Sequence, residues 1–438
     1  MYNYQKDFPI DEFRVRREKI MDRIGPHGVA VLAGLGSTGA FDFFRQSNEF
    51  YYLTGVEVPH AYLLIDGKQR RSTLYLPHHD AKHERSDGPQ LHCDAPDGVS
   101  KTTGIEIVAP LKQLALDVEA AKTIFTLRAP AEGRQACQDT LRYQRHLIQA
   151  DPWNQQESRE AHFLGKLATL APKAAFENLS PILDEMRLLK SPRELEQMRR
   201  TGRLTAEAVV AAIRRTRPGL FEYQLVATAE YIYLNGGAKG GGYRAIAAQG
   251  PNIWNAHYFR NDCQLEAGEL MLLDYAPDMA NYTSDIGRMW PINGKYTTVQ
   301  RELYGFVVEY QKVLLKVIRP HATIQDLSRE AAAMIRPVWE SWPFSKPAYR
   351  EATRKMIESE IAFTHPVGMA VHDVGAYKHA PLQPGLVFAL DPQMWVHEEN
   401  LYIRVEDTVA VTADGVESHT AAAPLDLDEV EALVGADR

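Results

Sequence analysis

The chain has 438 residues, an apolar share of 45%, and 49 Lys and Arg against 57 Asp and Glu, which gives a formal net charge of −8. This length exceeds that of most single hydrophobic cores, so we expect two domains. The mixed, mildly acidic charge offers no basic surface for phosphates or anionic lipid, which excludes nucleic acid and membranes as partners.

The first 21 residues and the cysteines predict a cytoplasmic protein. The opening segment is charged and lacks the apolar core of a signal peptide, and no later stretch is long and apolar enough to span a bilayer. Cys93, Cys137 and Cys263 are odd in number and have no CxxC spacing, so neither disulfides nor a zinc-thiolate site is indicated. We expect three isolated buried thiols.

The first third of the chain predicts a small α/β domain. Short apolar runs typical of strands occur at 27–35, 60–67, 72–77 and 122–128, and helical patterns occupy 10–24 and 108–121. A composition shift at 168–182 indicates a connection. We therefore divide the chain into an N-terminal domain, 1–174, and a C-terminal domain, 175–438.

Within the N-terminal part, "PHHDAKHE" places His79 and His83 one helical turn apart. Such a pair could hold a metal ion, but the acid of an HExxH site is missing and Pro77 opens the segment. A solvated loop is the favoured interpretation.

A long helix is predicted to open the C-terminal part. In "SPRE", Ser191 can cap, Pro192 fits the first turn and Glu194 completes a capping box before a helical pattern that extends to about Arg215. The remainder mixes helices with long strands and hairpins, which is typical of an α+β arrangement.

The stretch "LLDYAPDMANYTSDIG" places two acidic residues on the arms of a predicted hairpin. Asp274 and Asp285 are equidistant from a turn between Met279 and Ala280 in the turn-prone "PDMAN". Directly opposed residues have Cβ atoms about 5 Å apart, and like charges there destabilise a sheet. We therefore expect a positive charge between them.

A second acidic pair is predicted near the C-terminus, where Asp391 and Glu406 are equidistant from the polar turn "HEEN", His397–Asn400. Any single acidic residue of this kind is more simply a core or surface carboxylate. Two such pairs separated by histidines indicate a shared site. The histidines are His365 and His372 in "HPVGMAVHDVG", with His257 in "WNAHYFRND" earlier in the chain.

Four carboxylates with one or two imidazoles form a hard, oxygen-rich donor set. This set suits Mn²⁺ or a similar octahedral ion better than a closed tetrahedral zinc site. Four acids also indicate two cations, between which a water ionises near neutral pH and acts as a nucleophile. The expected chemistry is hydrolysis.

These motifs resemble the creatinase/aminopeptidase family, and aminopeptidase P within it. The matching stretches are 272–296, 365–375 and 402–412, with Phe43–Ile65 and Met186–Gly202 in the N-terminal domain and at the start of the catalytic domain. The resemblance covers nearly the whole chain. It implies an α+β pita-bread catalytic domain preceded by a smaller α/β, creatinase-like domain.

The resemblance also implies roles for individual residues. Two divalent ions, with Mn²⁺ favoured and Co²⁺, Fe²⁺ or Zn²⁺ as alternatives, would be bound by Asp274, Asp285, His365, Asp391 and Glu406. Asp274 would bind one ion bidentately, and Asp285 and Glu406 would bridge both. His257 and His372 would contact substrate and stabilise the oxyanion, Asp391 would accept the proton of the attacking water, and Tyr377 and Arg404 would lie around the ligands.

The chain departs from the family at the fourth carboxylate. The family has Glu-Pro-Gly where this sequence reads Asp391, Pro392 and Gln393, so the side chain is shorter by one carbon–carbon bond, about 1.5 Å. Ile361 stands where the family often has a further histidine, and "HERSDG" lacks a tryptophan common in the N-terminal domain. These changes put the catalytic rate and the substrate preference in question.

The function implied by the resemblance is removal of the first residue from a peptide with proline at the second position, by a dimer or tetramer. Alternatives within the fold are a prolidase-type dipeptidase and a hydrolase or lyase acting on a non-peptide small molecule. A third alternative, a non-catalytic binding module like the pita-bread domains of histone chaperones, is disfavoured because all five ligand positions keep a metal-binding side chain.

Overall fold

The computed structural model describes residues 4–37, 39, 41–359 and 364–437. The chain forms two compact units, Met1–Met186 and Arg187–Arg438. The division falls after Met186, whereas the composition shift predicts it after Ala174. The difference arises because β6 (Ala175–Asn178) pairs with β5 (Thr123–Thr126) of the N-terminal sheet. Ile361 lies outside the described residues.

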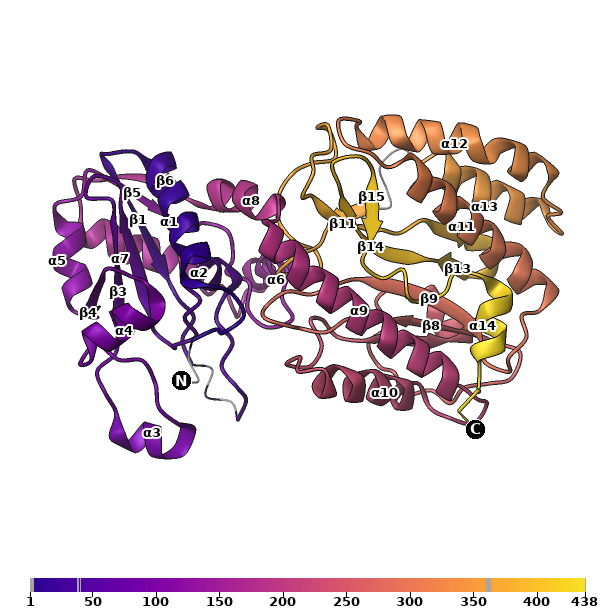
Figure 1. The fold of residues 1–438 in the computed structure, drawn as a ribbon, viewed down its shortest axis with the longest axis horizontal. Coiled ribbons are helices and arrows are strands. Elements are labelled where there is room, and N and C mark those ends of the chain that lie inside the picture. The colour runs from indigo at the N-terminus through magenta and orange to yellow at the C-terminus, as the bar shows by residue number, and fades with distance from the viewer. Residues whose placement is uncertain (1–3, 38, 40, 360–363, 438) are drawn as a thin grey trace. The chain divides into compact units, whose positions relative to one another are not determined.

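The N-terminal unit contains a mixed sheet with helices, as the sequence predicts (Figure 1). In spatial order its strands are β4 (Ile107–Pro110), β3 (Arg71–Leu76), β2 (Tyr62–Asp66), β1 (Gly28–Ala33), β5 and β6. Its helices are α1 (Ile10–Ile24), α2 (Asn48–Thr54), α3 (Ala81–Asp87), α4 (Pro96–Thr103), α5 (Gln113–Glu119), α6 (Gln138–Ala150) and α7 (Arg159–Leu170), and α8 (Ser180–Leu188) runs across the division.

Two predictions in this unit need correction. The helix predicted over 108–121 begins only at Gln113, because Ile107–Pro110 pairs in parallel with β3 as a strand. The loop predicted around His79 and His83 contains the short helix α3, capped by the Asp80 side chain, although none of its residues is buried.

The C-terminal unit has a larger sheet, whose strands lie between the helix pair α9 and α10 and the group α11, α12 and α13 (Figure 1). In spatial order the strands are β10 (Thr364–Pro366), β11 (Val387–Leu390), β14 (Glu406–Val411), β9 (Ile286–Pro291), β8 (Leu270–Asp274) and β7 (Ile246–Gln249), with β15 (Val416–Ser418) beside β14. A separate ribbon joins β12 (Gln393–Val396) and β13 (Leu401–Arg404). The helices are α9 (Pro192–Arg215), α10 (Glu222–Asn235), α11 (Thr298–Val317), α12 (Ile324–Ser341), α13 (Pro347–Ile357) and α14 (Leu427–Leu433), with short 3₁₀ turns η1 (Gly250–Trp254) and η2 (His397–Glu399).

The predicted start of α9 is confirmed. The Ser191 hydroxyl accepts a hydrogen bond from Glu194 N at 3.2 Å, and the Glu194 carboxylate accepts one from Ser191 N at 2.8 Å. This reciprocal capping box satisfies two backbone donors that a helix start otherwise leaves unpaired. The helix ends at Arg215, as its pattern predicts. Among the described residues, no helix combines the length and apolarity that a bilayer crossing requires.

Candidate metal centre

The first acidic hairpin forms with a register different from the predicted one. Asp274 ends β8 and pairs with Gly287, whereas Asp285 lies just before β9. The turn falls between Ala280 and Asn281, one residue later than predicted, because both adopt positive φ (55° and 64°), as the two-residue turn of a hairpin requires. The two acids are therefore offset by two residues instead of directly opposed.

The carboxylates of this hairpin nevertheless meet at one point. The Tyr243 hydroxyl lies 2.7 Å from Asp274 Oδ1 and 2.9 Å from Asp285 Oδ1. Tyr243 precedes β7, whose first residue, Ile246, pairs with Asp274. The sequence gives no signal for this tyrosine, because its position depends on pairing between strands that are distant in the chain.

The second hairpin has the predicted register. Leu390 pairs with Asp407 and Gln393 with Arg404, so Asp391 lies level with Glu406. The turn is η2 with Asn400 in the left-handed conformation, within the predicted His397–Asn400. The second acidic pair therefore forms as expected.

Gly287 brings the two hairpins together, because it pairs with Asp274 on one side and with Glu406 on the other. A Cβ atom at this glycine would lie 3.1 Å from Glu406 Cβ and 3.3 Å from Arg404 Nε. Contacts this short are rare for real Cβ atoms. The close approach of the acidic strands thus depends on a residue without a side chain.

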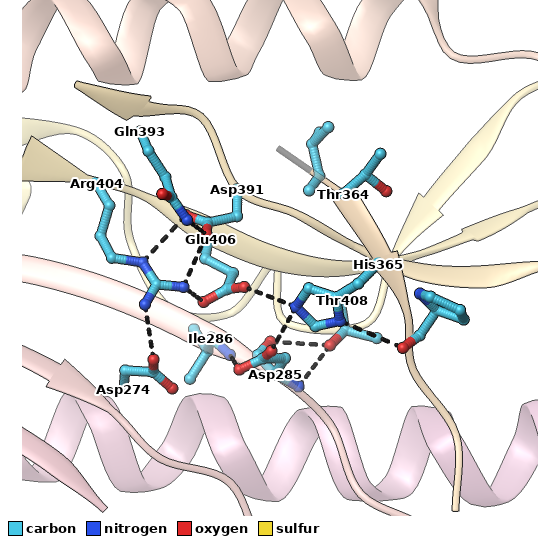
Figure 2. Close-up of polar contacts among 12 residues, drawn as sticks. Asp274, Asp285, Ile286, Thr364, His365, Asp391, Gln393, Arg404, Glu406 and Thr408 are labelled. Carbon is cyan, nitrogen blue, oxygen red and sulfur yellow. Dashed lines mark hydrogen bonds and ion pairs between the residues drawn. The ribbon is translucent and has the colours of Figure 1, made fainter. Parts of the chain in front are cut away.

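His365 faces the same point from β10, which pairs with β11 through His365 and Ala389. Its Nε2 atom lies 3.3 Å from Asp285 Oδ2 and 3.7 Å from Glu406 Oε1 (Figure 2). Ligand atoms of these three residues all lie within 4.8 Å of one another. This arrangement could hold a metal ion.

Arg404 occupies the other half of the cluster. Its Nη1 donates to Asp274 Oδ2 at 2.8 Å, and its Nε and Nη2 donate to Asp391 Oδ1 and Oδ2 at 3.0 and 2.9 Å (Figure 2). Nη2 also donates to Glu406. Gln393, the residue paired with Arg404, donates to Asp391 as well. Here a bidentate guanidinium supplies the positive charge that the acidic pairs require.

The cluster is almost fully buried: Asp274, Asp285, Asp391 and Glu406 are each at most 4% exposed. Burial raises the pKa of Asp274 to about 7, although Arg404 opposes the shift, and raises that of Glu406 well above its ordinary value. Burial acts in the same direction on Asp285, but the imidazole of His365 outweighs it and lowers the Asp285 pKa to about 2. The cluster therefore favours added positive charge.

The remaining predicted residues form an outer layer on the His365 side. The His372 ring lies 4.2 Å from that of His365, and the exposed His257 ring lies 6.5 Å from that of His372. The Tyr377 hydroxyl hydrogen-bonds the Thr364 hydroxyl, next to His365, and its ring stacks on Phe388. The two histidines thus extend from the cluster toward solvent, whereas Tyr377 supports β10.

Asp373, the residue after His372, forms buried ion pairs with Arg187 and Lys190 that the sequence did not indicate. Asp373 accepts hydrogen bonds from Arg187 Nη2 at 2.5 Å and from Lys190 Nζ at 3.2 Å. The two cations outweigh the effect of burial and lower the Asp373 pKa. The pair fixes the loop that carries His372.

Two protein-family models match the chain. Residues 196–413 match the model of metallopeptidase family M24, and residues 13–124 match the aminopeptidase P N-terminal domain. The chain is 28% identical to the Xaa-Pro aminopeptidase of Escherichia coli K12, covering 98% of both chains, and 27% identical to human Xaa-Pro aminopeptidase 3, covering 96% of this chain and 85% of the relative.

Solved structures give the same result for the fold. Zinc-substituted E. coli aminopeptidase P in complex with product superposes with a TM-score of 0.82 at 26% identity, covering 99% of this chain and 100% of that chain. Proline aminopeptidase P II from Yersinia pestis gives a TM-score of 0.79 at 27% identity, covering 98% and 99%.

Proposed function

The chain belongs to metallopeptidase family M24, and we propose that it is a metallo-aminopeptidase that removes the first residue of a peptide with proline at the second position. One observation carries the proposal: four buried carboxylates and His365 converge on one point within a fold matched over nearly its whole length. The proline preference is supported by the named relatives. Manganese as the resident ion, a cytoplasmic location and a homo-oligomer remain predictions.

The donor set fits a pair of divalent cations. Its oxygens and single imidazole are ligands that hard and borderline ions accept. The buried Glu406 Oε1 atom accepts no hydrogen bond, because its neighbour His365 Nε2 is 3.7 Å away, so this oxygen can accept a further ligand. The residues that would hold the ions are Asp274, Asp285, His365, Asp391 and Glu406. Two bound cations supply Lewis-acid activation of water and of the scissile carbonyl.

Asp391 is the residue that we assign to proton transfer. Its carboxylate accepts hydrogen bonds from Arg404 Nε, Arg404 Nη2 and Gln393 Nε2, which fix the orientation of both oxygens. These hydrogen bonds orient the aspartate side chain, which is shorter than the glutamate that the family has at this position. In the proposed reaction Asp391 accepts the proton of the attacking water and returns it to the leaving proline nitrogen.

His372 and His257 are assigned to the substrate carbonyl. Both are ring donors at the open side of the cluster, and His372 is near enough to His365 to act on the same reacting group. Donors placed where negative charge develops stabilise the transition state more than the substrate. The buried Arg187–Asp373 pair would keep His372 in place during the reaction.

The direct test is hydrolysis of Xaa-Pro peptides by the manganese-loaded protein, with Xaa-Ala peptides as the matched control. We expect release of the first residue from the proline peptides only. Asp391→Asn should lower kcat by about 10²–10⁴, the usual contribution of a positioned general base. No release from any Xaa-Pro peptide would contradict the proposal and favour a non-peptide substrate.

Asp391→Glu probes the departure from the family at this ligand. If the hydrogen bonds to Arg404 and Gln393 compensate for the shorter side chain, kcat with an Xaa-Pro peptide should stay near that of the natural chain. A large gain would mean that the natural site is tuned for another substrate.

A further inference from the structure

A second cluster of metal-binding side chains lies in the N-terminal unit, between β3 and α4. His78 follows β3, Cys93 and Asp94 come just before α4, and a hydrogen bond from Cys93 N to Pro77 O at 3.0 Å holds the two segments together. His78 Nδ1 lies 3.3 Å from Cys93 Sγ and 2.7 Å from Asp94 Oδ1, and Cys93 Sγ lies 3.9 Å from Asp94 Oδ1. Cys93 is buried and forms no disulfide, as expected, but it is not isolated, because His78 and Asp94 lie beside it.

The three ligand atoms lie close enough together for small side-chain rotations to bring them around a zinc ion. With Zn–S near 2.3 Å and Zn–N and Zn–O near 2.0 Å, tetrahedral geometry separates the ligand atoms by about 3.3–3.5 Å. The separation of His78 Nδ1 from Cys93 Sγ, 3.3 Å, lies within this range; the separation of His78 Nδ1 from Asp94 Oδ1, 2.7 Å, is shorter, and that of Cys93 Sγ from Asp94 Oδ1, 3.9 Å, is longer. Cys93 is buried, whereas His78 and Asp94 are exposed and can rotate slightly to complete the site.

Further donors adjoin this group. His79 Nε2 lies 3.0 Å from Glu84 Oε2, and the rings of His79 and His92 are 4.9 Å apart. Asp94 connects the two groups, because its Oδ2 accepts a hydrogen bond from His79 N at 2.7 Å and lies 3.7 Å from His92 Nδ1. His83, which the sequence pairs with His79, instead contacts Asp87.

Within the segment that these residues hold, the helix α3 has no apolar support, and Leu91 is the buried apolar residue nearest to the site in sequence. None of the residues of α3 is buried, and Figure 1 shows this helix on a long loop away from the sheet of its unit. Ordering such a segment costs conformational entropy that no hydrophobic contact of α3 offsets. Metal coordination supplies free energy for ordering in small elements of this kind.

In the part of the chain that the structure describes, a second group of donors contains a cysteine: Glu222, Asp262 and Cys263. Both oxygens of Glu222 are already used, by the backbone N–H groups of Gln249 and Cys263 and by the Tyr258 hydroxyl. Glu222 is also fully buried and so acts as a structural anchor, whereas the Asp94 side chain is exposed and can turn toward an ion. This group therefore serves as the matched control.

We propose that His78, Cys93 and Asp94 bind one zinc ion, with water at the fourth position, and that this ion orders the segment between β3 and α4. His79, Glu84 and His92 surround the ion and complete its polar environment. This site is independent of the proposed peptidase activity, since it shares no residue with the C-terminal cluster.

Cobalt(II) substitution of the full-length protein tests the proposal, because thiolate ligation gives a sulfur-to-cobalt charge-transfer absorption and no candidate ligand in the C-terminal cluster contains sulfur. We expect this absorption to saturate at about one bound cobalt ion per chain. The absorption should be lost in Cys93→Ser and retained in Cys263→Ser and His83→Ala. In His78→Ala the affinity for cobalt should fall on the order of tenfold or more. Absence of the band in the natural chain, or its survival in Cys93→Ser, would overturn the proposal.

Limited proteolysis supplies a second readout, and its main comparison, the natural chain with and without zinc, needs no variant. Zinc should slow cleavage within residues 78–94 of the natural chain and of His83→Ala, but not of Cys93→Ser. Equal cleavage of the natural chain with and without zinc would refute the ordering role.

Discussion

Replacement of Arg404 by methionine tests whether positive charge is what allows the acidic strands to meet. Arg404 is 6% exposed, donates to Asp274 and Asp391, and also contacts Glu406. Methionine keeps much of the apolar bulk but removes all of these hydrogen bonds. In the metal-free protein the carboxylates would then be buried without the guanidinium.

The size of the effect follows from the burial. Removing one partner of a buried ion pair costs about 3–5 kcal/mol. For a unit of this size 1 kcal/mol corresponds to about 2–4 °C, so the Tm of the metal-free variant should fall by roughly 6–20 °C. Manganese at 100 times its Kd stabilises by about 2.7 kcal/mol per ion. Loading should therefore restore most of the loss.

Calorimetry of the chelator-treated and manganese-loaded proteins measures both quantities, with Arg187→Met as the control. Arg187 forms an equally buried pair with Asp373, outside the carboxylate cluster. That variant should lose stability whether or not manganese is present. The reasoning is refuted if metal-free Arg404→Met unfolds at the temperature of the natural chain, or if manganese does not raise the Tm of Arg404→Met.

Three further changes have defined outcomes. Gly287→Ala should weaken manganese binding by about tenfold or more in titration calorimetry, because its Cβ would displace Glu406; unchanged affinity would contradict the close approach. Burial lowers the pKa of His419 to about 4, so below about pH 6.5 the unfolded chain binds a proton that the folded chain does not, and the free energy of unfolding decreases as the pH is lowered. In urea unfolding the natural chain should lose about 2 kcal/mol more than His419→Leu between pH 7 and pH 5, and equal losses would exclude this linkage. Ser191→Ala, which removes the cap paired with Glu194, should cost about 1 kcal/mol of unfolding free energy, and no loss would mean that the capping box is dispensable.

The sequence predicts those parts of the site that depend on neighbouring residues, such as the turn and the register of a hairpin. The register of the second hairpin was readable because one polar turn, His397–Asn400, separates two apolar strands. In the first hairpin "PDMAN" contains several turn formers, and only the backbone shows that Ala280 and Asn281 take the positive φ values. The two acids meet in spite of the altered register because Tyr243 and Gly287 bring their strands together.

Contacts between distant segments could not be predicted. The three-way contact of Arg404 with the acids depends on pairing between hairpins more than a hundred residues apart. In the N-terminal unit, His78 meets Cys93 and Asp94 only because the chain returns to the end of β3 after α3. Spacing within "PHHDAKHE" carried no information on those partners.

Anomalous diffraction from crystals of the manganese-loaded protein tests the central claim most directly. We expect two manganese peaks among the carboxylates of Asp274, Asp285, Asp391 and Glu406, with His365 coordinating one of them. The claim is contradicted if no peak occurs there and Arg404 alone still neutralises the four acids at saturating manganese.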